Sequence, residues 1–142
     1  RLAGDHADVF SQLPEELHAR LLRDYINSAS FHDLPSDLLD ALAAPWLGVA
    51  GQSAFYRQLE QRRADGAYIE RMRSRYTTIQ MPVLISAGID DNWVPVRRSH
   101  EFTELVPDCE LATFDNAGHL LQVDRPAQLT ALLLDFLDRH AP

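Results

Sequence analysis

Lysine does not occur in this sequence, so all 13 basic residues are arginines, and they face 21 acidic residues among the 142 positions. The formal net charge is therefore −8 at pH 7. Proteins that bind nucleic acid usually carry the opposite balance, because neutralising backbone phosphates requires an excess of basic side chains. The composition therefore argues against a nucleic-acid-binding protein.

Cysteine is almost as scarce, with Cys109 alone in the chain. One cysteine cannot form an intramolecular disulfide, so nothing requires an oxidising compartment, and we expect a cytoplasmic protein. The opening RLAGDHADVF lacks the basic start and the apolar stretch of a signal peptide, and Arg1 in place of Met indicates a piece of something longer. Because the apolar runs are too short for a membrane span, we expect no membrane partner.

With 46% hydrophobic residues, the chain is long enough to bury a core, and its two halves follow different patterns. Residues 1–78 carry only helical periods, with helices expected from Pro14, from Ser36, over Gln52–Arg63 and after the break at Asp65. Residues 79–142 instead follow the order strand, helix, strand and helix. We therefore predict two segments, 1–78 and 79–142. The first predicted helix carries an apolar stripe of Leu17, Leu21, Leu22 and Tyr25.

The second segment predicts a parallel strand-helix-strand unit followed by a helix. Its first strand is the apolar run Val83–Ala87, a helix covers residues 95–106, and the second strand spans Cys109–Phe114. In such a unit the carboxyl ends of both strands lie at one edge of the sheet, which is where ligands bind in open α/β sheets.

The loops that leave these strands bring an acid and a histidine to the same edge. Asp90 and Asp91 follow the first strand, and His119 follows the second. A carboxylate that accepts a hydrogen bond from one imidazole nitrogen fixes the tautomer and stabilises the imidazolium formed when the other nitrogen takes a proton. Each residue alone also has a structural interpretation, since Asp-Asn before a helix often only caps it, and the histidine could pack against Leu120.

The stretches PVLISAGIDDNWVP and FDNAGHLLQVDRP resemble the acid loop and the histidine loop of the α/β-hydrolase superfamily. In that pattern the catalytic acid lies three residues after the glycine that ends the strand, which implies Asp91, and the histidine follows Ala-Gly, which implies His119. PWLGVAGQSAFYRQLEQ is similar, more loosely, to the family's helical cap. The resemblance implies an α/β fold, with the C-terminal part of an α/β-hydrolase fold in residues 79–142 and a helical cap in residues 1–78.

That family carries its nucleophile on a G-x-S-x-G elbow or its Asp and Cys variants, and no such segment occurs here. The nearest match is Gly51-Gln52-Ser53-Ala54-Phe55, where Phe55 replaces the second glycine, which argues against Ser53 as the nucleophile. The resemblance implies a cofactor-independent hydrolase of a carboxylic ester or a similar small, partly apolar substrate. Its nucleophile would lie in a missing N-terminal half, so the chain would be inactive alone. Alternatives are an Asp nucleophile, as in haloalkane dehalogenases and epoxide hydrolases, or a non-catalytic binding module.

Aromatic side chains supply the candidate substrate-binding residues. Trp93 could line the mouth of the active site, and Trp46, Phe55 and Tyr56 could line a substrate pocket beneath the cap. All of them could equally be packing residues. We expect no metal, because the histidines show no ligand spacing such as H-E-x-x-H, and the resemblance implies that no cofactor is needed. Two strands would leave an apolar sheet edge exposed, and we expect a missing N-terminal half or a second copy of the chain to cover it.

Overall fold

The computed structural model describes residues 2–61 and 66–141, and within them the chain forms two compact units. The first unit comprises the described residues up to Asn27 and those from Leu34 to Ile69, and the second comprises Ser28–Asp33 and the residues from Glu70 onward. These units differ from the predicted division between residues 78 and 79, because the second begins earlier and includes a short segment from the first half. The assignment of the two segments as cap and hydrolase core stays a prediction.

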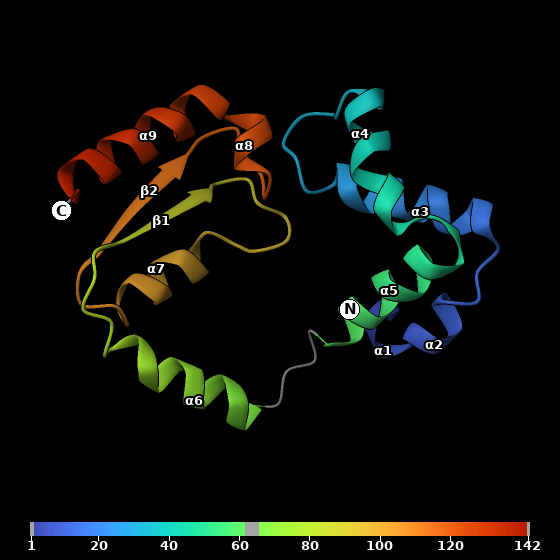
Figure 1. Cartoon of the computed structure of the whole chain (residues 1–142), viewed down its shortest axis with the longest axis horizontal. Helices are drawn as coiled ribbons and strands as arrows, with labels where there is room; N and C mark the ends of the chain where they lie inside the picture. Colours follow the sequence, from blue (N-terminus) through green and yellow to red (C-terminus); the bar gives the residue numbers. More distant parts are fainter. Residues whose placement is uncertain (1, 62–65, 142) are drawn as a thin grey trace. The chain divides into compact units, whose positions relative to one another are not determined.

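Short helices make up the first unit (Figure 1). Acidic side chains in the first turn favour the start of its 13-residue helix, because they interact well with the helix dipole. The helices predicted from Pro14 and Ser36 are confirmed, and the third begins before the predicted Gln52, while Arg62, Arg63 and Asp65 lie outside the described residues. The elements are α1 (Leu2–Asp5), α2 (Ala7–Phe10), α3 (Glu15–Asn27), α4 (Ser36–Ala43), the 3-10 turn η1 (Ala44–Trp46), α5 (Gly48–Gln61) and α6 (Gly66–Tyr76), which ends in the second unit.

The core of the first unit includes a buried histidine that the sequence pattern did not predict. Leu22 of α3 is buried as expected, but Leu17 of the same predicted stripe is 51% exposed, and its neighbour His18 is fully buried. His18 Nε2 lies 2.9 Å from the carbonyl oxygen of Trp46, and Nδ1 lies 3.1 Å from the hydroxyl of Tyr56. Because both ring nitrogens have partners, the imidazole can occupy an apolar core without an unsatisfied polar group.

The second unit contains the predicted parallel pair of strands. Val83 lies opposite Cys109 and Gly88 opposite Phe114, so the carboxyl ends of both strands lie at one edge. Figure 1 shows α7 and α9 on either side of this strand pair. The helix between the strands is shorter than the predicted 95–106, and a short helix after the histidine loop was not predicted. The elements are β1 (Val83–Gly88), α7 (Arg97–Thr103), β2 (Cys109–Phe114), α8 (Leu121–Asp124) and α9 (Pro126–Arg139).

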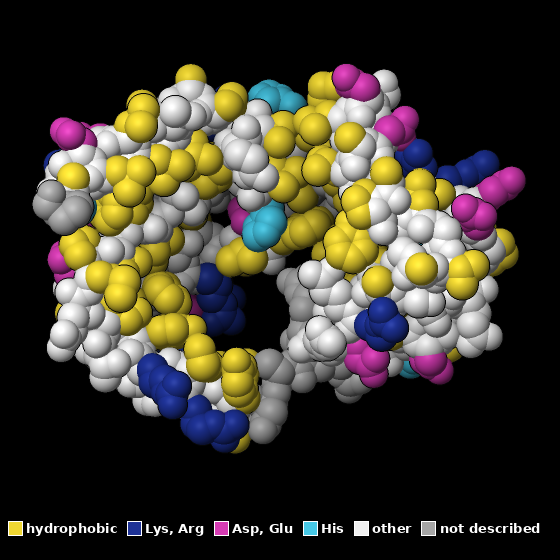
Figure 2. All heavy atoms as spheres, in the orientation of Figure 1, with side chains coloured by type: hydrophobic (Ala, Val, Ile, Leu, Met, Phe, Trp, Pro, Cys, Tyr) yellow, Lys and Arg dark blue, Asp and Glu magenta, His cyan; other side chains and the backbone are white. Residues whose placement is uncertain are grey.

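The second unit leaves apolar surface uncovered. Among the described strands, β1 pairs only with β2. Leu134 and Leu137 of α9 are each 62% exposed, and Figure 2 shows hydrophobic side chains at the surface over this helix. That a missing N-terminal half or a second copy of the chain covers this surface stays a prediction.

Within residues 2–61 and 66–141, no helix is long and apolar enough to cross a membrane.

Candidate active site

The loops that leave β1 and β2 are joined by their main chains. The N–H of Ile89 donates to the carbonyl oxygen of Phe114, and the N–H of Asp90 donates to that of Ala117, both at 3.0 Å. A Cβ on Gly88 would lie 2.2 Å from the carbonyl oxygen of Ala117, so this approach requires glycine at the end of β1. Backbone contacts alone therefore fix the position of the two loops relative to each other.

Asp91 uses its two carboxylate oxygens for different purposes. Oδ1 accepts hydrogen bonds from the backbone N–H groups of Trp93 at 2.7 Å and Val94 at 2.8 Å, which fixes the turn before α7. Oδ2 lies 2.8 Å from Nδ1 of His119. The side chain of Asp91 is only 9% exposed. Asp90, the alternative acid, is exposed and contacts the histidine loop through its backbone. The structure thus brings Asp91, rather than Asp90, to His119.

The hydrogen bond to Asp91 determines how the imidazole of His119 is protonated. An ionised carboxylate only accepts, so Nδ1 of His119 carries the proton and donates it to Oδ2 of Asp91. In the neutral ring Nε2 therefore has a lone pair. The side chain of His119 is 40% exposed, and none of the hydrogen bonds formed within the described residues reaches Nε2. This arrangement leaves a basic nitrogen accessible to a reacting group.

Trp93 lies beside the imidazole. The ring centroids of Trp93 and His119 are 5.1 Å apart, with their planes tilted by 35°. The indole Nε1–H of Trp93 donates to the hydroxyl of Ser28 at 3.1 Å, which orients the ring. Trp93, one of the four aromatic residues predicted to bind substrate, thus lies in the second unit and contacts His119.

A buried carboxylate, Asp124 at the end of α8, supports the histidine loop from behind. Oδ2 accepts hydrogen bonds from the backbone N–H of Gly118 at 2.8 Å and of Phe31 at 3.0 Å, and Oδ1 accepts from the hydroxyl of Ser30. Burial by itself would raise the pKa of Asp124, but the hydrogen bonds from Ser30, Gly118 and Phe31 together hold it below its ordinary value. The carboxylate is therefore ionised at neutral pH.

Sequence reasoning missed Asp124 and its partners. An aspartate before Arg125 and Pro126 reads as an ordinary residue at the start of a helix, and nothing local connects it to residues 28–33, more than 90 positions earlier. Such long-range hydrogen bonds leave no periodic pattern that a single sequence could reveal.

The other three predicted substrate-binding aromatics pack in the first unit. Tyr56 is 1% exposed, Phe55 is almost as buried, and Trp46 packs against that core. The ring of Phe55 contacts the rings of Trp46 at 5.9 Å, Tyr56 at 5.2 Å and Tyr25 at 5.6 Å. Of the two interpretations that the sequence left open, this geometry favours packing. A role for Trp46, Phe55 and Tyr56 in binding substrate stays a prediction.

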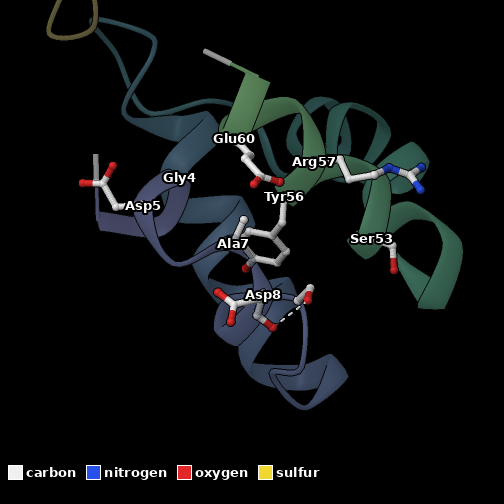
Figure 3. A pocket seen from close by; sticks show the side chains of 9 residues that line it. Gly4, Asp5, Ala7, Asp8, Ser53, Tyr56, Arg57 and Glu60 are labelled. Carbon is white, nitrogen blue, oxygen red and sulfur yellow. Dashed lines mark hydrogen bonds between the residues drawn. The ribbon is translucent and has the colours of Figure 1, made fainter. Parts of the chain in front are cut away.

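Tyr56 also forms part of a cavity of about 270 Å³ between α5 and the first two helices. Figure 3 shows Tyr56 reaching toward Ala7, while Arg57 extends away from it. Ser53, the residue in the centre of the imperfect elbow motif, lines the same cavity from the interior of α5. A residue within a helix is not at the turn between a strand and a helix that the nucleophile elbow requires.

Comparison with curated proteins relates the chain to hydrolases. No family model matches it. An uncharacterised protein of Mycobacterium tuberculosis is 29% identical over 98% of the chain, and a carbamate hydrolase named RutD from Acinetobacter baylyi is 36% identical over 46% of it. A 2-hydroxy-6-oxononadienedioate/2-hydroxy-6-oxononatrienedioate hydrolase of Pseudomonas putida is 36% identical over 45% of the chain. The chain spans 42%, 25% and 22% of the lengths of these relatives.

Solved structures define the fold. An α/β hydrolase fold protein from Burkholderia ambifaria superposes with a TM-score of 0.86 at 37% identity, over 95% of this chain and 49% of that protein. The esterase EaEST from Exiguobacterium antarcticum superposes with a TM-score of 0.69 at 19% identity, over 95% of this chain and 48% of the esterase. The chain therefore has the fold of the C-terminal portion of the α/β-hydrolase superfamily, and several of the relatives that it matches over a shorter stretch are named as hydrolases.

Proposed function

We propose that this chain supplies the general base and its orienting acid to a cofactor-independent hydrolase. The observation that carries the proposal is the 2.8 Å hydrogen bond between Nδ1 of His119 and Oδ2 of Asp91, with Nε2 left accessible. Asp91 holds the productive tautomer and stabilises the imidazolium, and His119 exchanges protons with the reacting groups. The nucleophile comes from residues outside this chain.

Each proton transfer in the proposed reaction passes through Nε2. The nucleophile gives its proton to Nε2 of His119 as its oxygen or sulfur forms a bond with the substrate carbonyl carbon. The carbonyl π electrons move to oxygen and then return, which breaks the bond to the leaving group, and Nε2 returns the proton to that group. Water then attacks the covalent intermediate by the same route and restores the free enzyme.

The proposed substrate is a carboxylic ester or a similar small, partly apolar molecule. Support comes from the relatives, since one is named as a carbamate hydrolase and another as a hydrolase of an oxo-dienoate, and both names describe compounds that carry a carbonyl group. Trp93, beside His119, would contact the apolar part of such a substrate.

The test replaces His119 by alanine in the complete protein that contains this chain, with hydrolysis of a panel of chromogenic esters as the assay. We expect kcat to fall by roughly three orders of magnitude or more, because removing the base of a catalytic triad leaves only residual rate enhancement. The substitution Asp91→Asn should lower kcat by a similar factor, since the amide no longer holds the productive tautomer of His119. The matched control is His100→Ala, an exposed histidine on α7, which should retain full activity.

Unchanged ester turnover by a folded His119→Ala protein would refute the proposal. A fluorophosphonate probe that labels a serine separates the serine mechanism from the one with an aspartate nucleophile, which this probe would not label.

A further inference from the structure

His119 is fixed on both sides by one short segment that precedes α4. The residue before it, Gly118, donates its N–H to Oδ2 of Asp124 at 2.8 Å, and Asp124 is bound in turn to Ser30 and Phe31. The residue after it, Leu120, donates its N–H to the carbonyl oxygen of Ala29 at 3.1 Å. Residues 28–33 therefore fix the backbone at His119 through the residues before and after it in the chain.

The backbone of Gly118 packs closely against residues 28–33. A Cβ on Gly118 would lie 2.7 Å from the carbonyl oxygen of Ala29 and 3.1 Å from the N–H nitrogen of Phe31, both of which are backbone atoms. Glycine at position 118 thus lets the histidine loop lie directly against the segment, and Asp124 accepts a hydrogen bond from the N–H of this glycine. Leu121, which begins α8, is buried as well.

The charge of Asp124 matters because all its described partners are donors. The donors to the two oxygens include the Ser30 hydroxyl and the N–H groups of Phe31 and Gly118, and a backbone hydrogen bond from His32 also lowers the pKa of the carboxyl. A carboxylate can accept all of these bonds, whereas an amide of the same size presents an NH₂ group in place of one oxygen. If that NH₂ takes the place of Oδ2, it faces the N–H groups of Gly118 and Phe31 and those contacts open. If it takes the place of Oδ1, the Ser30 hydroxyl must turn from donor to acceptor, and the bond from Gly118 loses its ionised acceptor and weakens.

We propose that Asp124 is a positioning residue, which acts through the backbone N–H of Gly118 to hold His119 at hydrogen-bond distance from Asp91, with residues 28–33 as the fixed support. The inference rests on the proposed function of His119. A displacement of about 1 Å at a catalytic group costs on the order of 100-fold in rate. Because Asp124 acts on the position of His119, we expect the loss to appear in kcat rather than in KM.

The test compares Asp124→Asn with Asp115→Asn in the complete protein. Asp115 lies in the same loop, but its side chain is exposed, and only its backbone oxygen takes part in a described hydrogen bond. We expect Asp124→Asn to lower kcat by about 10- to 100-fold with KM nearly unchanged. We also expect it to shift or broaden the far-downfield NMR signal of the Nδ1 proton of His119. Asp115→Asn should match the unmodified protein in both measurements.

Ser30→Ala keeps the test decisive if Asp124→Asn does not fold. It removes one donor and leaves the carboxylate in place, so we expect a folded protein with a smaller loss of kcat and a measurable shift of the Nδ1 signal. A folded Asp124→Asn protein with unaltered kcat and Nδ1 signal would show that Asp124 only stabilises the fold. The same result for Ser30→Ala, when Asp124→Asn is unfolded, would also overturn the inference.

His119→Ala separates this inference from the proposed function. If His119→Ala is inactive while the Asp124 and Ser30 variants are fully active, the positioning role alone is wrong. If His119→Ala is itself active, the proposed function fails, and the NMR signal still reports whether Asp124 positions the ring.

Discussion

The end of β1 offers a direct test of how the site is assembled, through the substitution Gly88→Ala. A Cβ at this position would lie 2.2 Å from the carbonyl oxygen of Ala117 and 2.4 Å from that of Gly118. Ordinary van der Waals contact begins near 3.4 Å, so the added methyl group falls about 1 Å short of the space it needs. Both obstructing atoms belong to the backbone, and neither can move away by rotating a side chain.

The structure sets the size of the expected effect. Forcing an extra carbon into a packed site costs typically 1–3 kcal/mol, and two backbone clashes place Gly88→Ala at about 3 kcal/mol of lost stability. The strain is relieved by moving the loop of His119 away from β1, which breaks the hydrogen bond from the N–H of Asp90 to the carbonyl oxygen of Ala117. A shift of about 1 Å in this loop would reduce turnover on the order of 100-fold.

Urea unfolding and ester hydrolysis measure these two effects in the same protein. The matched control is Gly66→Ala at the start of α6, where a Cβ would meet no atom within 4 Å and alanine is the better helix former. Gly66→Ala should match or slightly exceed the stability of the unmodified protein. If Gly88→Ala and Gly66→Ala unfold at the same urea concentration, the backbone contact between the two loops is not the constraint inferred from the structure.

Two further substitutions test the cores and the surface charges of the units. Leu22→Ala in α3 removes a fully buried side chain and should cost about 3 kcal/mol in urea unfolding, whereas Leu17→Ala, on the same helix but 51% exposed, should change stability by less than about 0.5 kcal/mol. Hydrogen bonds from Arg139 lower the pKa of Glu110 from its ordinary 4.5 to about 2, so this carboxylate stabilises the fold above pH 4.5 and loses that effect as the pH falls toward 2. Glu110→Gln should therefore lower the thermal unfolding midpoint at pH 7 and leave it unchanged near pH 2, and a difference that grows on acidification would contradict this sign.

The strands and their loops could be predicted because their signals are local. A short apolar run that ends in Gly88 identifies β1, and parallel pairing then follows from the helix between the strands. The position of Asp91 relative to that glycine and of His119 relative to Gly118 follows from the same loops. The 2.8 Å contact between the two side chains agrees with this local reading.

Hydrogen bonds between residues far apart in the chain could not be predicted from the sequence. The segment of residues 28–33 lies between two helices of the first unit, yet it packs in the second because Asp124 and Leu120 bind it. In α3, the apolar period placed Leu17 inward, but His18 occupies the core because Tyr56 and the carbonyl of Trp46 satisfy its nitrogens. Polar groups with distant partners change burial in ways that hydrophobic periodicity does not record.

The two oxygens of Asp91 have different partners, and this difference supports the proposed catalytic role over a purely structural one. Capping the turn before α7 accounts for Oδ1, which accepts both backbone hydrogen bonds, from Trp93 and Val94. That role does not involve Oδ2, which lies against the imidazole of His119. The side chain of Asp91 is 9% exposed, so it has lost most of its hydration to make this contact. Its partner His119 is 40% exposed and would need no buried acid for stability alone. Stabilising a proton that arrives at Nε2 accounts for both features, which is why the pair supports hydrolysis better than a capping role does.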